Sequence, residues 1–405
     1  MASSSQHPRT QRGDDGELSG SIDALLHRDA LHEILLRVPA KALYRFRTVC
    51  QSWRSLLSAP SFVAAHAARH GDDQPLLAVC GWVPGTGRRA AEFKLLDTLS
   101  GHVVKRFDVG PPSLLRRVWS SSHLDLVLIV RRVDHHHRTM RDDRRPLSVL
   151  DPATGDVTVL PGGCYDDTRT SFVFGRVAAA SSSSTGEGDG EYKVLSLNTP
   201  LRRRYQFCKI LTVGGGGGSR GAWRDAPAPP VHIKTFHRGE AVVAGGVVYH
   251  LVDCSGGWTI AAFDLGAEQW LPDLLHGPAE PPAPPANSNS REGRSLAEVN
   301  GRLAAVYSTT SAMEMWQLMG SGKKAQWCKR CRVLMSFMDT ECRYWLTPDP
   351  VPLWVMDDGR VAFWLRGLSQ SGTLWIYDPM TETCTRLANC LRMGASGYTG
   401  SLLRQ

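Results

Sequence analysis

The chain has 405 residues, which is enough for two or three ordinary domains, or for one small module and one large β domain. Its hydrophobic fraction of 42% is close to that of a soluble globular protein, and its charged fraction of 21% is slightly low. The formal net charge is +8, but the basic residues are spread along the chain, so a nucleic-acid surface is not favoured.

The first 20 residues are polar and rich in Gly and Ser, which predicts a disordered tail over residues 1–20. This segment has no continuous apolar run of the kind found in signal peptides, so we expect no secretory signal. The longest aliphatic run, residues 126–130, is too short to span a bilayer. The ten cysteines are scattered, which favours reduced thiols in the cytoplasm or the nucleus.

Residues 21–70 have a helical pattern. Leu31, Ile34, Leu35 and Val38 recur at the spacing of one amphipathic helical face. Pro39 ends that helix, and apolar residues then continue at steps of three and four as far as Leu57. Pro60 suits the first turn of a further helix.

The segment 76–405 has the texture of β structure, with short apolar runs separated by turn residues. Low-complexity stretches at residues 181–190, 214–219 and 277–290 predict flexible surface inserts between strands.

A loose repeat runs through this β segment. An apolar strand ends in Asp, a turn of Pro, Thr, Gly or Glu follows, and a second strand begins, as at Asp97, Asp151, Asp264 and Asp378. These aspartates are 54, 113 and 114 residues apart, so the long steps are about twice the short one. Degenerate copies at 208–225 and 313–330 fit the gaps. The sequence thus predicts a β-propeller of about six blades, with an irregular β domain or two sandwiches as the alternative.

No candidate motif for catalysis, metal binding or cofactor binding has all the residues that its chemistry requires. Cys328 and Cys331 have C-x-x-C spacing but no second pair to complete a zinc site, and the His135–His137 run cannot converge on one ion. The "GSGKK" stretch, residues 320–324, lacks the Ser or Thr and the following helix of a phosphate loop, and is better interpreted as a hairpin. We therefore expect no metal, no cofactor and no enzymatic activity.

The helical segment has more apolar residues than three short helices can bury. About 45 residues lie near the lower limit for independent folding, so the surplus predicts an exposed patch. Such a patch docks either on a partner protein or on the β domain of the same chain, and the residues alone do not decide between the two.

A family resemblance favours the partner. "ILLRVP" (34–39), "LYRFRTVCQSW" (43–53) and "PSF" (60–62) resemble the F-box position after position, with departures at His27 and Gln51. The β segment is similar, more loosely, to the F-box-associated β-propeller regions of plant F-box proteins. The resemblance therefore implies a small N-terminal F-box followed by an all-β, propeller-like domain.

In this family the F-box docks on the Skp-type adaptor of a cullin–RING ubiquitin ligase, and the downstream domain holds a protein substrate. The resemblance implies nine adaptor-facing residues: Leu26, Leu31, Ile34, Leu35, Pro39, Leu43, Val49, Cys50 and Trp53. Some of them also form the core of the module, and the sequence does not separate the two roles. Leu35→Asp combined with Trp53→Ala is predicted to abolish adaptor binding.

The resemblance thus implies a substrate-recognition subunit that reaches a cullin through its adaptor. From the spread of the basic residues and the short aliphatic runs, we expect no binding to nucleic acid or membrane. A propeller lectin and a protein-interaction scaffold outside the ligase are the alternatives.

Overall fold

The structure is a computed structural model with two compact units, residues 1–71 and residues 72–403, and we treat each by itself. The residues it describes are 28–38, 40–69, 76–82, 91–98, 100–110, 115–119, 125–131, 147–162, 168–177, 191–200, 205–233, 241–252, 258–279, 293–309, 311–320, 322–335, 349–366, 371–391 and 394–398. The expected tail 1–20, the insert 181–190 and most of the insert 277–290 lie outside these ranges.

The first unit contains four short helices: α2 (Arg28–Leu35), α3 (Ala40–Phe46), α4 (Gln51–Ser58) and α5 (Pro60–Arg69). Helices of this length are unstable alone in water, so they depend on packing against one another. Cys50 caps α4, because its extended backbone lets its Sγ accept a hydrogen bond from the Trp53 amide at 3.5 Å. Pro60 opens α5, as the sequence predicts.

The helices enclose a core of leucines and one phenylalanine: Leu31, Leu35, Leu36, Leu43, Leu57 and Phe62. Two buried polar side chains tie distant segments together. Arg47 donates from Nη2 to the Leu57 carbonyl at 3.1 Å, and His66 donates from Nε2 to the Val38 carbonyl at 2.9 Å. No helix in the described part of the chain is long and apolar enough to cross a membrane.

The second unit is a six-bladed β-propeller in which every strand pair is antiparallel. Blade 1 consists of β25 (Gly394–Tyr398), β1 (Leu76–Trp82), β2 (Ala91–Asp97) and β3 (Val103–Gly110). Blade 2 consists of β4 (Leu115–Trp119), β5 (Val127–Arg131), β6 (Leu147–Leu150) and β7 (Val157–Leu160). Blade 3 consists of β8 (Thr168–Arg176), β9 (Tyr192–Pro200), β10 (Phe207–Val213) and β11 (Arg224–Ala226).

The other three blades follow the same plan. Blade 4 consists of β12 (Ala241–Ala244), β13 (Val247–Leu251), β14 (Thr259–Asp264) and β15 (Gln269–Trp270), with β16 (Leu275–His276) also paired to β14. Blade 5 consists of β17 (Gly293–Val299), β18 (Arg302–Ser308), β19 (Ala312–Met319) and β20 (Gln326–Leu334), with the short helix η1 (Gly322–Lys324) before β20. Blade 6 consists of β21 (Asp349–Val355), β22 (Val361–Arg366), β23 (Ser371–Asp378) and β24 (Thr383–Leu391).

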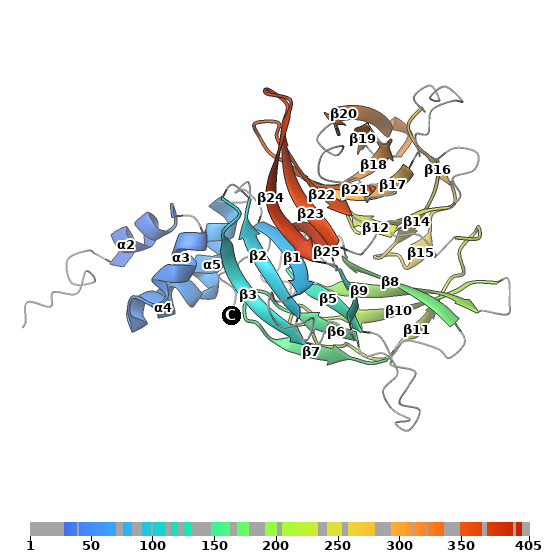
Figure 1. The fold of residues 1–405 in the computed structure, drawn as a ribbon. Coiled ribbons are helices and arrows are strands. Elements are labelled where there is room, and N and C mark those ends of the chain that lie inside the picture. The colour runs from blue at the N-terminus through green and yellow to red at the C-terminus, as the bar shows by residue number, and fades with distance from the viewer. Residues whose placement is uncertain are drawn as a thin grey trace, which may run out of the picture. The chain divides into compact units, whose positions relative to one another are not determined.

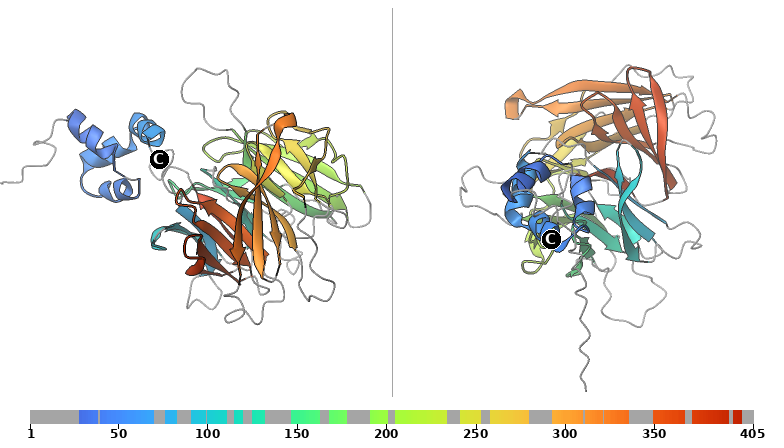
Figure 2. Two further views of the ribbon diagram at one scale, coloured as in Figure 1. Left: turned by 90° about the horizontal axis from the view of Figure 1, so that it is seen from above. Right: turned by 90° about the vertical axis from the view of Figure 1, so that its left-hand side faces the viewer.

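The six sheets follow one another around a ring in Figure 1. The ring is closed by β25, which pairs with β1 from the opposite end of the domain. Figure 2 (left) shows the twisted sheets of blade 5 (orange) and blade 6 (red) side by side, and β17 contacts β21. The architecture of a few helices followed by a propeller of six blades is confirmed.

Each blade is covered on both faces by its neighbours. On β5, Leu128 packs with Phe174 and Val194 of blade 3, while the next residue, Ile129, packs with Phe93 of blade 1. A strand buried on both faces has a continuous apolar sequence instead of an alternating one. This burial explains the aliphatic run at 126–130.

The sequence repeat falls on one structural position in every blade, the hairpin between the third strand and the outermost strand. The aspartates act as expected: Asp151 and Asp378 each accept a hydrogen bond on Oδ1 from the amide two residues later, at 2.7 and 2.8 Å. Asp264 accepts from two amides of its own turn. In blade 3 residues 214–219 form this hairpin, where the Gly217 amide donates to the Gly214 carbonyl at 2.9 Å.

Three tryptophans near or on outermost strands link neighbouring blades. Trp223 donates from Nε1 to the Pro161 carbonyl at 3.0 Å, and Trp270 donates to the Pro227 carbonyl at 2.9 Å. Trp327 makes the equivalent bond to the His276 carbonyl at 2.8 Å. These three tryptophans therefore pack blade against blade.

Candidate functional site

The structure divides the nine predicted adaptor-facing residues into three groups. Leu31, Leu35 and Leu43 are at most 6% exposed and belong to the core of the helical unit. Leu26 and Pro39 lie outside the described residues. The remaining four, Ile34, Val49, Cys50 and Trp53, reach the surface to different degrees.

Three of these four, together with Phe46, form a cluster that we call the α3–α4 corner: Phe46, Val49, Cys50 and Trp53. The rings of Phe46 and Trp53 meet edge to face, with centroids 5.6 Å apart. The Val49 amide donates to the Phe46 carbonyl at 3.1 Å. Cys50 then begins α4 through its bond to the Trp53 amide.

The corner offers an apolar surface to solvent. Val49 is 58% exposed, and Phe46, Cys50 and Trp53 are half-buried. The corner is flanked in sequence by two exposed arginines, Arg45 and Arg54, and Arg54 donates from Nε to the Arg47 carbonyl at 3.3 Å. An apolar centre with a charged margin is the usual anatomy of a protein interface.

Ile34 is the other large apolar side chain that the described part of the helical unit exposes, at 49%. It lies on α2 between Glu33 and the buried Leu35, so it points away from the core that Leu31 and Leu35 enter.

Phe46 is absent from the nine predicted residues, although it belongs to the corner. Its spacing of seven residues from Trp53 gave a helical signal, but the chain leaves the helix between them, at Arg47–Cys50. Periodicity therefore could not show that the two rings meet.

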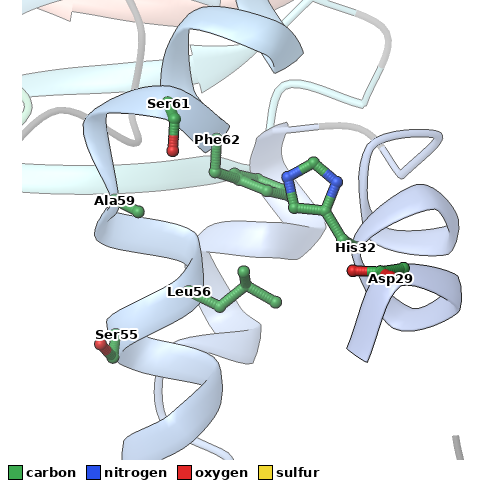
Figure 3. Close-up of a pocket in the computed structure, with 7 residues that line it drawn as sticks. All are labelled: Asp29, His32, Ser55, Leu56, Ala59, Ser61 and Phe62. Atoms are coloured by element: carbon green, nitrogen blue, oxygen red, sulfur yellow. The ribbon is translucent and has the colours of Figure 1, made fainter. Parts of the chain in front are cut away.

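A separate hollow of about 240 Å³ lies between α2 and the junction of α4 and α5. Its lining is Asp29, His32, Ser55, Leu56, Ala59, Ser61 and Phe62. Figure 3 shows the His32 imidazole beside the Phe62 ring, and the two rings meet edge to face at 5.2 Å. None of the seven predicted residues that the structure describes lines this hollow.

The described residues contain no group of three or more His, Cys, Asp or Glu side chains placed to hold a metal ion. Cys328 and Cys331 lie on one strand, β20, as free thiols, and burial raises the pKa of Cys331 to about 11. A thiol with so high a pKa is a poor nucleophile near neutral pH. The described residues of the 320–324 stretch, Gly320 and Gly322–Lys324, lie in the hairpin between β19 and β20, as predicted. His135–His137 lie outside the described residues.

Known proteins resemble both units. Residues 130–390 match the family described as "F-box associated beta propeller domain", and residues 25–64 match the F-box domain. The putative F-box protein At3g10240 of Arabidopsis thaliana is 24% identical over 318 residues, which cover 73% of this chain and 68% of that protein. F-box/kelch-repeat protein At3g23880 of the same plant is 25% identical over 344 residues, which cover 81% of this chain and 82% of that protein.

Other similarities are less extensive. F-box/LRR-repeat protein At2g43260 of Arabidopsis thaliana is 24% identical over 263 residues, and the match spans only 57% of that protein's length. Among solved structures, the periplasmic gluconolactonase PpgL of Pseudomonas aeruginosa aligns with 80% of this chain and 97% of its own, at 13% identity and a TM-score of 0.37. A similarity at that score supports no statement about the function of this chain.

Proposed function

Because the chain belongs to the F-box associated β-propeller family and has an F-box ahead of the propeller, we propose that it is the substrate-recognition subunit of a Skp–cullin–F-box ubiquitin ligase. The F-box docks the Skp-type adaptor, which connects it to the cullin. The propeller binds a protein substrate.

The α3–α4 corner is the observation that supports this proposal most directly. Val49 exposes more than half of its surface to water, and the other three residues of the corner are half-buried. Burying this surface against another protein removes apolar area from water and favours binding. The flanking Arg45 and Arg54 favour a partner with acidic groups around its apolar contact.

In this role the chain catalyses nothing itself. It raises the local concentration of substrate lysines near a ubiquitin-loaded conjugating enzyme, so its contribution is one of proximity. Cytoplasm and nucleus, the compartments favoured by the scattered cysteines, are where we propose that it works.

Two other functions remain as competitors. A propeller lectin would bind glycans through its loops and would need no adaptor. A scaffold outside the ligase would bind the adaptor or other proteins without promoting ubiquitin transfer.

Co-purification distinguishes these functions. We expect the full chain to purify with a Skp-type adaptor and cullin, and to promote ubiquitination of proteins captured by residues 72–403. Glycan binding without adaptor binding would support the lectin instead. An adaptor complex that transfers no ubiquitin to any captured protein would support the scaffold.

A further inference from the structure

Lysine is scarce in this chain, and most of the lysines that the structure describes hold their amines in hydrogen bonds or ion pairs. Nine of the 47 basic residues are lysines: Lys41, Lys94, Lys105, Lys193, Lys209, Lys234, Lys323, Lys324 and Lys329. The side chains of Lys41, Lys234 and Lys323 lie outside the described set. The six remaining lysines all belong to the propeller.

Five of these six make close contacts. Lys193 is almost fully buried, with its Nζ 2.7 Å from the Leu265 carbonyl oxygen and 2.9 Å from Glu268 Oε1. Lys105 donates to the Pro152 and Ala153 carbonyls of the neighbouring blade.

The other three of the five form ion pairs on their own blades. Lys94 pairs with Glu92, and Lys209 pairs with Asp225 at 3.1 Å. Lys329 pairs with Glu314 at 2.9 Å and lies over the Trp316 ring. Each of these amines must leave an oxygen partner before it can react.

Lys324 differs from the other five. It is exposed at the tip of the β19–β20 hairpin, and no ion pair or side-chain hydrogen bond holds it within the described part of the chain. The tip itself is tightly built: Gly320 and Gly322 both have positive φ, and the Ala325 amide donates to the Gly322 carbonyl at 3.1 Å. A side chain added at Gly322 would meet no other part of the molecule within 4 Å, so the tip is open to solvent.

We propose that Lys324, among the six lysines that the structure describes, is the residue that accepts ubiquitin when the receptor itself is modified. This inference rests on the proposed function, which supplies the ubiquitin thioester on a conjugating enzyme. The unprotonated Lys324 amine attacks the thioester carbonyl, an isopeptide C–N bond forms, and the C–S bond breaks. The amine loses one proton and the enzyme's cysteine leaves as a thiol, so no oxidant or reductant is needed. Because Lys324 is the one lysine of the six described that has no partner among the described residues, modification there would fall on blade 5 and spare the five lysines that link strands and blades.

The accessibility of Lys324 is tested without any ligase. The folded full chain is treated briefly with a limiting amount of an N-hydroxysuccinimide acetate, and acetylation is located by peptide mass spectrometry. Among the six described lysines, we expect Lys324 to be acetylated first and Lys193 last. Labelling of Lys209 or Lys329 as fast as Lys324 would overturn the inference.

The modification itself is tested in the reconstituted complex of the full chain with adaptor, cullin, RING subunit, activating and conjugating enzymes, and ubiquitin. We expect the ubiquitin-remnant peptide at Lys324, its loss in Lys324→Arg, and its persistence in the matched control Lys329→Arg. A complex that assembles but attaches ubiquitin only at other lysines would overturn this inference and leave the proposed function standing. A chain that fails to bind the adaptor at all would overturn both.

Discussion

The helical unit and the propeller bury their apolar side chains in different ways. In the propeller each sheet lies between two others, so Leu128 and Ile129, adjacent on β5, pack into the cores of different blade pairs. The helical unit has a single core, and Val49 and Ile34 remain outside it. The propeller also exposes large apolar side chains, such as Val159 and Met380, but its cores are closed between its own sheets. The helical unit exposes Val49 within the α3–α4 corner, next to its single small core, and another chain can cover that surface.

The units also differ in how they are held together. Blades are joined by strand ladders, by the closing pair β25–β1 and by the tryptophan bonds between neighbours. The four helices rely on six core side chains and a few hydrogen bonds such as that of Arg47 to Leu57. Small units have little stability to lose, so damage to the helical core should be severe and local.

Phe62→Ala should produce the largest effect. Phe62 is fully buried between His32 and His66, and truncating a buried Phe costs about 3–5 kcal/mol. We expect amides of residues 28–69 to lose protection from hydrogen exchange while amides of the propeller strands keep theirs. If the helices stay as protected as in the wild type, the unit is more robust than its core implies.

Acid should weaken the propeller through His250. Burial lowers the pKa of His250 to about 4, whereas an unfolded histidine titrates near its usual 6.5. Because the unfolded state takes up the proton first, stability should fall as pH drops from about 6.5 to about 4, by about 3 kcal/mol in total.

The His250→Gln variant, followed by thermal unfolding of the propeller at several pH values, should lose most of that slope. The exposed His102→Gln is the matched control and should keep it. An unchanged slope in His250→Gln would show that other groups cause the acid sensitivity.

Trp270→Phe should have a smaller effect. It removes the Nε1–H donor to the Pro227 carbonyl, and a lost hydrogen bond of this kind costs about 1 kcal/mol. Denaturant unfolding of the propeller measures the change, and Trp223→Phe and Trp327→Phe should match it because they make the same contact. Trp53→Phe, in the helical unit, removes no bond between blades and is the matched control.

Arg45→Glu should have the smallest effect. Reversing an exposed charge beside the α3–α4 corner should weaken adaptor binding by less than about 1 kcal/mol, mostly through slower association. The difference should shrink in high salt, which screens exposed charges. Arg302→Glu, an exposed arginine of the propeller, controls for the change in net charge. An equal effect of both variants would assign the change to total charge and not to the corner.

The sequence predicted the fold more completely than the site, for physical reasons. The turn aspartates recur because each blade needs the same hairpin, so Asp97, Asp151, Asp264 and Asp378 indicated the blades before any contact was known. The tryptophan bonds could not be predicted, since Trp223 and Pro161 are 62 residues apart and meet only across two blades.

In the helical unit, periodicity places Ile34 and Leu35 in one stripe, although Leu35 is buried and Ile34 is exposed. The Leu35→Asp and Trp53→Ala pair chosen from the sequence would therefore damage the core as well as the surface. Val49 lies in the turn between α3 and α4, where a helical pattern says nothing about exposure. Only the packing of the helices shows which of these apolar residues lie in the core and which are exposed.

Two valines test the central claim, that the helical unit and not the propeller docks the adaptor. Val49 and Val159 have similar exposure, 58% and 66%, but lie in different units. We expect Val49→Asp to weaken adaptor binding at least about tenfold, as for a central interface residue, and Val159→Asp to leave the dissociation constant unchanged. Wild-type affinity in Val49→Asp, with Val159→Asp weakened instead, would contradict the account.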